Sequence, residues 1–209
     1  MKKIIGLALA GLLILGMAGY STFAYFSDTE TSTNNIFTAG TLDLKTNNAD
    51  SVTATWGNGS NPVAPGYSSS GTVTLKNSGT IAANHVDIKF TVGTTSNAGT
   101  YNATDLGDAD ITDMSTVMTV TALSYGGNDL LQTSGIETLD AGTGGVLTLS
   151  ELNNYKIANL TAPGTNGSTP QDFAMTIGIP TSVGNGIQGD AVNLTVTFGL
   201  FQDASQTLP

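Results

Sequence analysis

Apolar and polar residues alternate strictly in four stretches of the chain, at residues 71–76, 86–92, 173–179 and 192–200. A period of two places apolar side chains on one face of a strand and polar side chains on the other. This pattern is typical of antiparallel sheets that have one buried and one solvated face. By composition and turn spacing, further strands are expected at residues 40–46, 51–56 and 116–123.

Turn-forming residues separate these stretches and indicate the fold class. They are Pro62, Pro65 and Gly66, then Asn77 and Gly79, then the glycines of the segments YGGND and SVGNGIQGD. Such residues supply the bends and positive φ angles that strand connections need. No helical pattern alternates with the strands, which argues against a parallel α/β fold. Seven or eight strands therefore predict an all-β fold, a two-sheet antiparallel sandwich of jelly-roll or immunoglobulin-like type.

Two short helices are expected in the connections between strands. The segment Thr104–Met114 carries acidic residues near its start, which suits the positive end of a helix dipole. The segment TLSELNNY places Thr148 three residues before Glu151, the spacing of a capping box.

The first 24 residues have the layout of a secretory signal peptide. Two lysines precede an apolar run over residues 4–18, and small residues at positions 22 and 24 suit cleavage by signal peptidase after Ala24. Cleavage after Ala18 and an uncleaved membrane anchor over residues 4–26 are the alternatives. The chain is thus expected to be secreted and to meet the membrane only during export.

Charge and cysteine content further reduce the range of possible functions. Removal of residues 1–24 leaves four lysines against sixteen acidic residues, a net charge of −12, with no arginine. Nucleic-acid binding and attraction to anionic lipid both need basic residues, so neither is expected. The chain has no cysteine. An exported protein without disulfides depends on core packing, metals or assembly with neighbours for its stability.

Few residues suggest catalysis, and we expect neither a cofactor nor an enzymatic activity. The only histidine, His85, falls on the polar face of its predicted strand with Asp87 and Lys89, where we expect it to be solvated. One histidine and no cysteine cannot supply the usual ligands of a zinc site. No serine lies in a nucleophile elbow, and no pair of carboxylates is singled out for glycoside hydrolysis.

Two weaker signals concern ions and glycans. Four carboxylates cluster within nine residues and are candidate calcium ligands, although their spacing is not that of an EF-hand: Asp105, Asp108, Asp110 and Asp113. Five N-x-S/T sequons are candidate glycosylation sites, at Asn58, Asn102, Asn159, Asn166 and Asn193.

The segment AYFSDTETSTNNIFTAGTLDL, from Ala24 to Leu44, resembles the mature start of the TasA/camelysin family. The later segments APGYSSSGTVTLKNSGTIAANHVDIKF, SELNNYKI and GDAVNLTVTFGLFQ resemble the family in order and spacing. The resemblance implies a jelly-roll fold and an extracellular structural role. Related proteins form biofilm-matrix fibres and, in archaea, bundling pili whose subunits join by strand donation. Some members are classed as metalloproteases, an activity for which this chain lacks recognisable zinc ligands.

The resemblance and the composition of residues 25–38 together predict a donor segment between the signal peptide (residues 1–24) and the sandwich domain (residues 39–209). Its aromatic and threonine-rich residues suit an extended strand that cannot fold alone. The expected polymerisation residues are Tyr25, Phe26, Ser27, Asp28, Thr29, Ile36 and Phe37. We therefore predict a homopolymer that forms a fibre or pilus. The alternatives are a camelysin-like secreted protease and a monomeric surface module for adhesion or glycan binding, with Trp56, Tyr67, Tyr101 and Tyr125 as its available aromatics.

Overall fold

A computed structural model describes residues 40–47, 49, 63–96, 111–132, 135–139 and 145–209. All of these belong to the second of two units into which the chain divides, Ala39–Pro209. The predicted signal peptide and donor segment lie outside the described residues, as does the predicted strand at residues 51–56.

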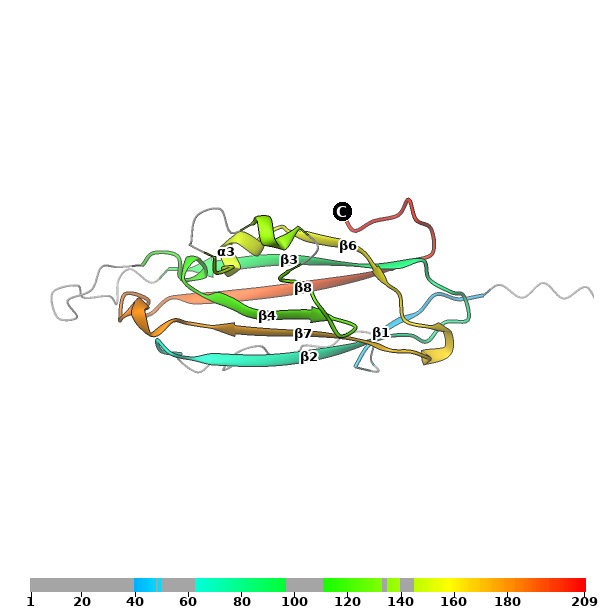
Figure 1. Cartoon of the computed structure of the whole chain (residues 1–209), viewed down its shortest axis with the longest axis horizontal. Helices are drawn as coiled ribbons and strands as arrows, with labels where there is room; N and C mark the ends of the chain where they lie inside the picture. The colour runs from blue at the N-terminus through cyan, green and yellow to red at the C-terminus, as the bar shows by residue number, and fades with distance from the viewer. Residues whose placement is uncertain (1–39, 48, 50–62, 97–110, 133–134, 140–144) are drawn as a thin grey trace, which may run out of the picture. The chain divides into compact units, whose positions relative to one another are not determined.

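The described residues form an all-β, two-sheet antiparallel sandwich, which confirms the predicted fold class (Figure 1). The large sheet has the strand order β1-β2-β7-β4-β5, and the small sheet has the order β6-β3-β8. The strands are β1 Leu44–Thr46, β2 Ser68–Asn77, β3 His85–Thr95, β4 Thr119–Tyr125, β5 Asn128–Asp129, β6 Lys156–Thr161, β7 Gln171–Gly178 and β8 Ala191–Phe201.

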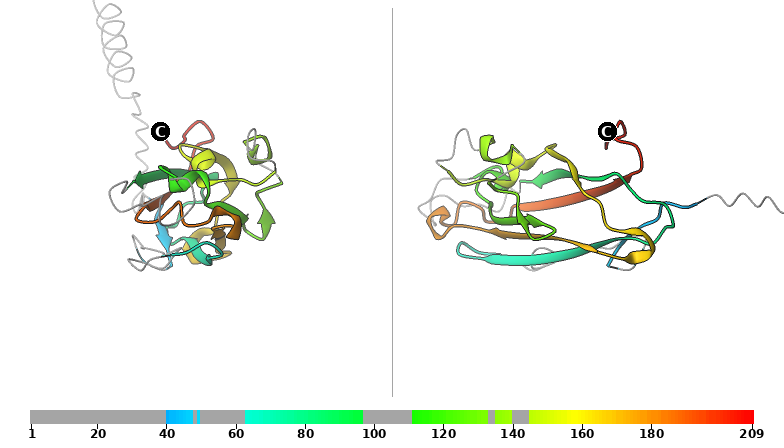
Figure 2. Two further views of the ribbon diagram at one scale, coloured as in Figure 1. Left: turned by 90° about the vertical axis from the view of Figure 1, so that its left-hand side faces the viewer. Right: turned by 45° about the vertical axis from the view of Figure 1, so that its right-hand side comes forward.

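The two sheets stack face to face, as the views in Figure 2 show, and aromatic side chains fill the space between them. Phe90 of β3 and Phe173 of β7 are fully buried, with ring centroids 6.2 Å apart. Phe198 of β8 meets Phe173 edge-on at 5.3 Å. Apolar residues of β2 and β4 complete this core from the large sheet: Val73, Leu75, Val120 and Leu123. The alternating faces seen in the sequence are therefore the faces that pack together.

The four alternating stretches lie in strands, apart from Ile179, which follows the last residue of β7. The strands without clear alternation are those that differ from expectation. The stretch at 116–123 becomes β4 only from Thr119, because Met114–Thr116 form a 3-10 helix. Of the stretch at 40–46, only Leu44–Thr46 pair as a strand. The sequence does not predict β6. The pairing of β6 with β3 shifts register between Val86 and Ile88, and Asn159 adopts a positive φ of 61°, so no regular alternation marks this strand.

The capping box predicted at Thr148 is confirmed, and the other predicted helix is not. The Thr148 hydroxyl accepts a hydrogen bond from the Glu151 backbone N–H, and the Glu151 carboxylate accepts one from the Thr148 N–H, at the start of α3 (Leu149–Leu152). Most of the segment Thr104–Met114 lies outside the described residues. Its described end is not α-helical, because the Asp113 carboxylate accepts the Ser115 N–H and starts the 3-10 helix instead.

The short hairpin between β4 and β5 follows its turn signal. Gly126 and Gly127 join the two strands with φ angles of 56° and 81°. Consecutive positive φ angles are the geometry of the tight turn that matches strand twist, and glycine adopts them without steric cost. Within the part of the chain that the structure describes, no helix is both long and apolar enough to span a bilayer.

Candidate functional site

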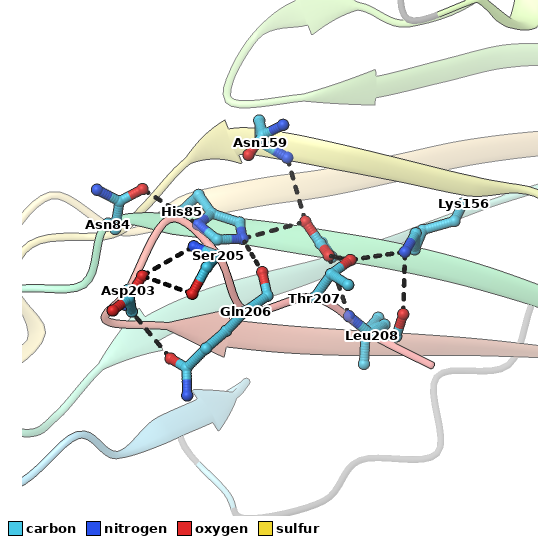
Figure 3. A network of polar contacts seen from close by, with 10 residues as sticks. Asn84, His85, Lys156, Asn159, Asp203, Ser205, Gln206, Thr207 and Leu208 are labelled. Carbon is cyan, nitrogen blue, oxygen red and sulfur yellow. Dashed lines mark hydrogen bonds and ion pairs between the residues drawn. The ribbon is translucent and has the colours of Figure 1, made fainter.

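The chain folds back on itself after β8, and this segment covers part of the small sheet. Residues 202–209, here called the strap, leave β8 at Phe201 and lie over the outward face of the sheet (Figures 1 and 3). The turn is held by Asp203, whose carboxylate accepts the Ser205 N–H at 2.8 Å and the Ser205 hydroxyl at 2.9 Å. These two bonds lower the pKa of the Asp203 carboxyl. The strap then reaches β3 and β6.

The Asp87 carboxylate is the main anchor of the strap. It is 0 % exposed, and one of its oxygens accepts the Thr207 hydroxyl at 2.6 Å and the Leu208 N–H at 3.1 Å. The other oxygen accepts the backbone N–H of Asn159 in β6 at 3.1 Å. Burial by itself raises the pKa of Asp87, but these hydrogen bonds and the nearby His85 outweigh it, so the pKa lies below its ordinary value. Asp87 is therefore a buried carboxylate that depends on the strap for its partners.

His85 lies beside Asp87, and the expectation that it is solvated is wrong. His85 is only 3 % exposed. Its Nε2 lies 3.1 Å from the Gln206 carbonyl oxygen and 3.5 Å from Asp87, and its Nδ1 lies 3.1 Å from the Asn84 side-chain oxygen. The ring also stacks on Phe201 with a centroid distance of 5.2 Å. Alternation did assign His85 and Asp87 to the outward face, but it describes one sheet and cannot show a distant segment that covers it.

Two lysines of the sheet also contact the strap. Lys89 of β3 and Lys156 of β6 lie opposite each other across the two strands. The Lys89 ammonium donates to the Pro209 carbonyl oxygen at 2.6 Å, and Lys156 donates to the Thr207 hydroxyl and the Leu208 carbonyl oxygen at 2.6 and 2.9 Å. Opposed like charges destabilise a strand pair, and the strap's acceptor oxygens offset this cost.

Gly199 of β8 lets the strap approach closely. A Cβ atom at this position would lie 2.9 Å from a methyl carbon of Leu208 and 2.7 Å from the Phe201 ring, closer than packed carbon atoms approach. Gly199 is also the register partner of Asp87. Leu208 therefore rests on the backbone of β8 beside the anchor on β3.

This cluster does not fit a metal site. Both ring nitrogens of the only histidine face oxygen atoms of the protein, and the chain has no cysteine. Among the residues with described placement, no group of three or more histidine, cysteine, aspartate or glutamate side chains is arranged to hold a metal ion. Of the predicted calcium ligands, Asp105, Asp108 and Asp110 lie outside those residues, and Asp113 caps the 3-10 helix.

The free edge of β8 is the second notable feature of the small sheet. Within the described part of the chain, β8 pairs along its eleven residues with β3 alone and ends the sheet. Its inward apolar row stays half-exposed: Val192, Leu194, Val196, Phe198 and Leu200. Toward the 196–201 end, the register partners on β3 are better covered, since Val86, Ile88 and Phe90 are each 0 % exposed. At this end the core is thus covered more completely on the β3 side than along β8.

The large sheet extends further than the small sheet on this side. The contact of Phe198 with Phe173 places β8 over β7, and the hydrogen bond from the Tyr125 hydroxyl to the Thr161 carbonyl oxygen places β6 over β4. The large sheet continues past β7 to β2 and β1, whereas the described small sheet stops at β8. One further strand beside β8 would lie over β2 and cover the half-exposed row.

The other candidate residues divide between described and undescribed parts of the chain. The sequons at Asn159, Asn166 and Asn193 have exposed asparagines, and those at Asn58 and Asn102 lie outside the described residues. Of the four aromatics considered for glycan binding, Tyr125 is buried and Tyr67 is half-buried, while Trp56 and Tyr101 are not described. The cleavage site at Ala24 and the predicted polymerisation residues, from Tyr25 to Phe37, also lie outside the described residues.

Comparison with known proteins places this β-sandwich within one family. Residues 1–129 match the camelysin metallo-endopeptidase family, so the chain belongs to it. This confirms the resemblance drawn from the sequence, to a family of secreted and surface proteins. A search of curated proteins finds no match.

The anchor at Asp87 predicts a loss of stability in acid. A carboxyl whose folded pKa is lowered contributes stability above its unfolded pKa, near 4, and loses it as the pH falls through the folded value. Urea unfolding at pH 7 and pH 3 should therefore show that Asp87→Asn costs stability at pH 7 and much less at pH 3. Asp203→Asn is the matched control, because its exposed carboxylate should give the same direction with a smaller effect. An equal cost of Asp87→Asn at both pH values would contradict the prediction.

Proposed function

We propose that the chain is an extracellular structural subunit that assembles with copies of itself into a fibre or pilus. Each subunit donates residues 25–38 to the next, and the fibre supports a biofilm matrix or cell–cell adhesion. The observation that carries this proposal is that β8, within the described part of the chain, has no strand on one side and keeps its apolar row only partly buried. A further strand beside β8 would lie over β2, and this position supports the β8 edge as the acceptor of the donated strand.

The backbone of β8 offers the hydrogen bonds that such a joint needs. Alternate residues of an edge strand direct their N–H and C=O groups away from the sheet, so β8 offers roughly ten groups to a partner strand. Each backbone hydrogen bond contributes about 0.5–1.5 kcal/mol net. A strand that makes eight or so of them, at roughly one bond per residue, would form a firm joint.

The donor segment supplies side chains for the open row. Tyr25, Phe26, Ile36 and Phe37 are its apolar residues, and burial of one large apolar side chain contributes about 1.5–3 kcal/mol. The residues between them are polar and rich in threonine, so the segment has little to bury against its own domain. Cleavage by signal peptidase after Ala24 would free this strand on export, so that assembly begins outside the cell.

A pair of lysine substitutions on β8 tests the acceptor edge. Val196→Lys places a charge in the half-exposed row, and Thr197→Lys places the same charge on the exposed outward face one residue away. We expect the first variant to remain monomeric and the second to form fibres, by negative-stain electron microscopy and sedimentation of the secreted protein. Both should keep the far-ultraviolet circular dichroism of the parent chain. Fibres from Val196→Lys as abundant as those of the parent would rule out β8 as the acceptor.

The family description supports a second candidate function, peptidase activity. Casein hydrolysis by the purified protein, with and without a chelator, tests it. Chelator-sensitive hydrolysis that is lost in His85→Ala, whose fold is checked by circular dichroism, would establish a metallopeptidase.

A further inference from the structure

The strap ties together all three strands of the small sheet. Leu208 packs against Gly199 of β8, its backbone N–H donates to Asp87 of β3, and its carbonyl oxygen accepts from Lys156 of β6. Gln206 contacts His85, and Thr207 donates to Asp87 (Figure 3). Pro209 accepts a hydrogen bond from Lys89. Eight residues thus connect an edge strand to the centre and to the opposite edge of its sheet.

These contacts secure β8, one of the two edge strands of the small sheet. Among the described strands, β8, like β6 at the opposite edge, has hydrogen-bonding partners on one side only, and its apolar row is only partly buried. Strands with few buried contacts and open backbone groups are the first to separate from a fold. The strap follows β8 directly, so its attachment to β3 and β6 opposes separation of the 196–201 end from Phe90, Ile88 and Val86.

The side chains that anchor the strap are more buried than the strap residues that cover them. Asp87 and His85 are 0 % and 3 % exposed, although most strap residues above them are exposed. A buried carboxylate is costly unless its lone pairs are satisfied, and Thr207 and Leu208 supply two of its three donors. Loss of the strap would leave Asp87 short of donors on β3, the only described neighbour of β8.

We propose that the strap keeps the β8 edge in the conformation that accepts a donated strand, and that Asp87 is the positioning residue through which it acts. This inference rests on the proposed function, since the occupant of the edge is residues 25–38 of a second copy. On this proposal, a subunit's ability to donate a strand and its ability to accept one can be lost separately. A copy with a detached strap keeps its donor segment and loses its acceptor edge, so it can add to another copy but nothing can add to it.

Two strap variants and one matched control test this separation in the full chain. Asp87→Asn removes the anchor's charge, and Thr207→Val removes one donor to it while keeping the shape of the side chain. Asp172→Asn is the control, because Asp172 also accepts a threonine hydroxyl at 2.6 Å, from Thr74, but lies exposed on the large sheet. Asp87→Asn replaces hydrogen bonds to a charged carboxylate with weaker hydrogen bonds to a neutral amide. We therefore expect the fraction of protein in fibres to fall about tenfold or more in this variant. It should fall less in Thr207→Val and stay unchanged in Asp172→Asn.

A mixing experiment distinguishes loss of accepting from loss of folding. Phe26→Asp weakens the donor segment and keeps the acceptor edge under the proposed function. Mixed with Asp87→Asn, which can donate, it should form heterodimers in analytical ultracentrifugation, and the mixture should form no more fibres than the two variants form separately. Circular dichroism reports folding, and Thr207→Val replaces Asp87→Asn in the mixture if the latter does not fold.

The outcomes separate the two proposals. Normal fibres from Phe26→Asp would count against strand donation itself. Normal fibres from both strap variants, with Phe26→Asp deficient, would overturn the role of the strap and leave strand donation standing. Folded strap variants that form neither fibres nor heterodimers would also overturn it, because the strap would then not act on accepting alone.

Discussion

A mature chain shortened to begin at Ala39 should stay monomeric and form no fibres. The shortened chain keeps every strand described here, because these strands all lie within Ala39–Pro209. If residues 25–38 are the donated strand, as proposed, the shortened chain would lose about eight intersubunit hydrogen bonds at about 0.5–1.5 kcal/mol each. It would also lose the burial of Tyr25 and Phe26 in the joint, at about 1.5–3 kcal/mol each. Even the lower sum corresponds to more than a thousandfold loss of affinity, since about 1.4 kcal/mol is a factor of ten.

Circular dichroism and sedimentation velocity would establish that the shortened chain is folded and monomeric, and negative-stain electron microscopy would show whether fibres form. Phe26→Asp in the full mature chain is the graded comparison, because it replaces one aromatic side chain of the proposed donor segment with a charge and leaves the backbone in place. It should weaken assembly without abolishing it. Fibres from the shortened chain that match those of the mature chain would show that residues 25–38 are not the donor.

Phe173→Ala should lower the free energy of unfolding by about 3–5 kcal/mol, the range for removing a large aromatic from a packed core. Phe173 is fully buried on β7, and its ring contacts Phe90 of β3 and Phe198 of β8. Its removal leaves a cavity that borders both sheets. Because typical domains are stable by only about 5–15 kcal/mol, this change would leave a marginal fold.

Urea unfolding followed by circular dichroism measures the loss for Phe173→Ala. Phe173→Leu is the matched control, since leucine keeps much of the apolar volume and should cost clearly less. Thr121→Ala, at an exposed position on β4, should change stability by less than about 0.5 kcal/mol. A loss under about 1 kcal/mol for Phe173→Ala would show that the interface between the sheets is not the main core.

The sequence predicted those parts of the fold that depend on local pattern. Alternation located the strands that carry Val73, Phe90, Phe173 and Val196, because one face of each strand packs on the other sheet. The capping box at Thr148 was also predictable, because its hydrogen bonds join residues three apart. Strand β6 was not, because its shifted register and the positive φ of Asn159 interrupt any alternation.

The candidate site was less predictable, because its contacts join residues far apart in the chain. Asp87 and Thr207 are separated by 120 positions, and nothing near either residue indicates the other. The half-exposed row on β8 has the same alternation as a fully covered strand, so its position at the edge appears only when the sheets are assembled. The predicted donor segment lies outside the described residues and remains a prediction.

A fibre joined through β8 has a direction. At one terminus the last subunit presents an unfilled β8, and at the other the first subunit presents an unused N-terminal strand, so the two termini differ chemically. A single break in the shaft creates one new terminus of each kind, and both can resume growth. The number of growing fibres would then rise with shear as well as with the supply of secreted subunits.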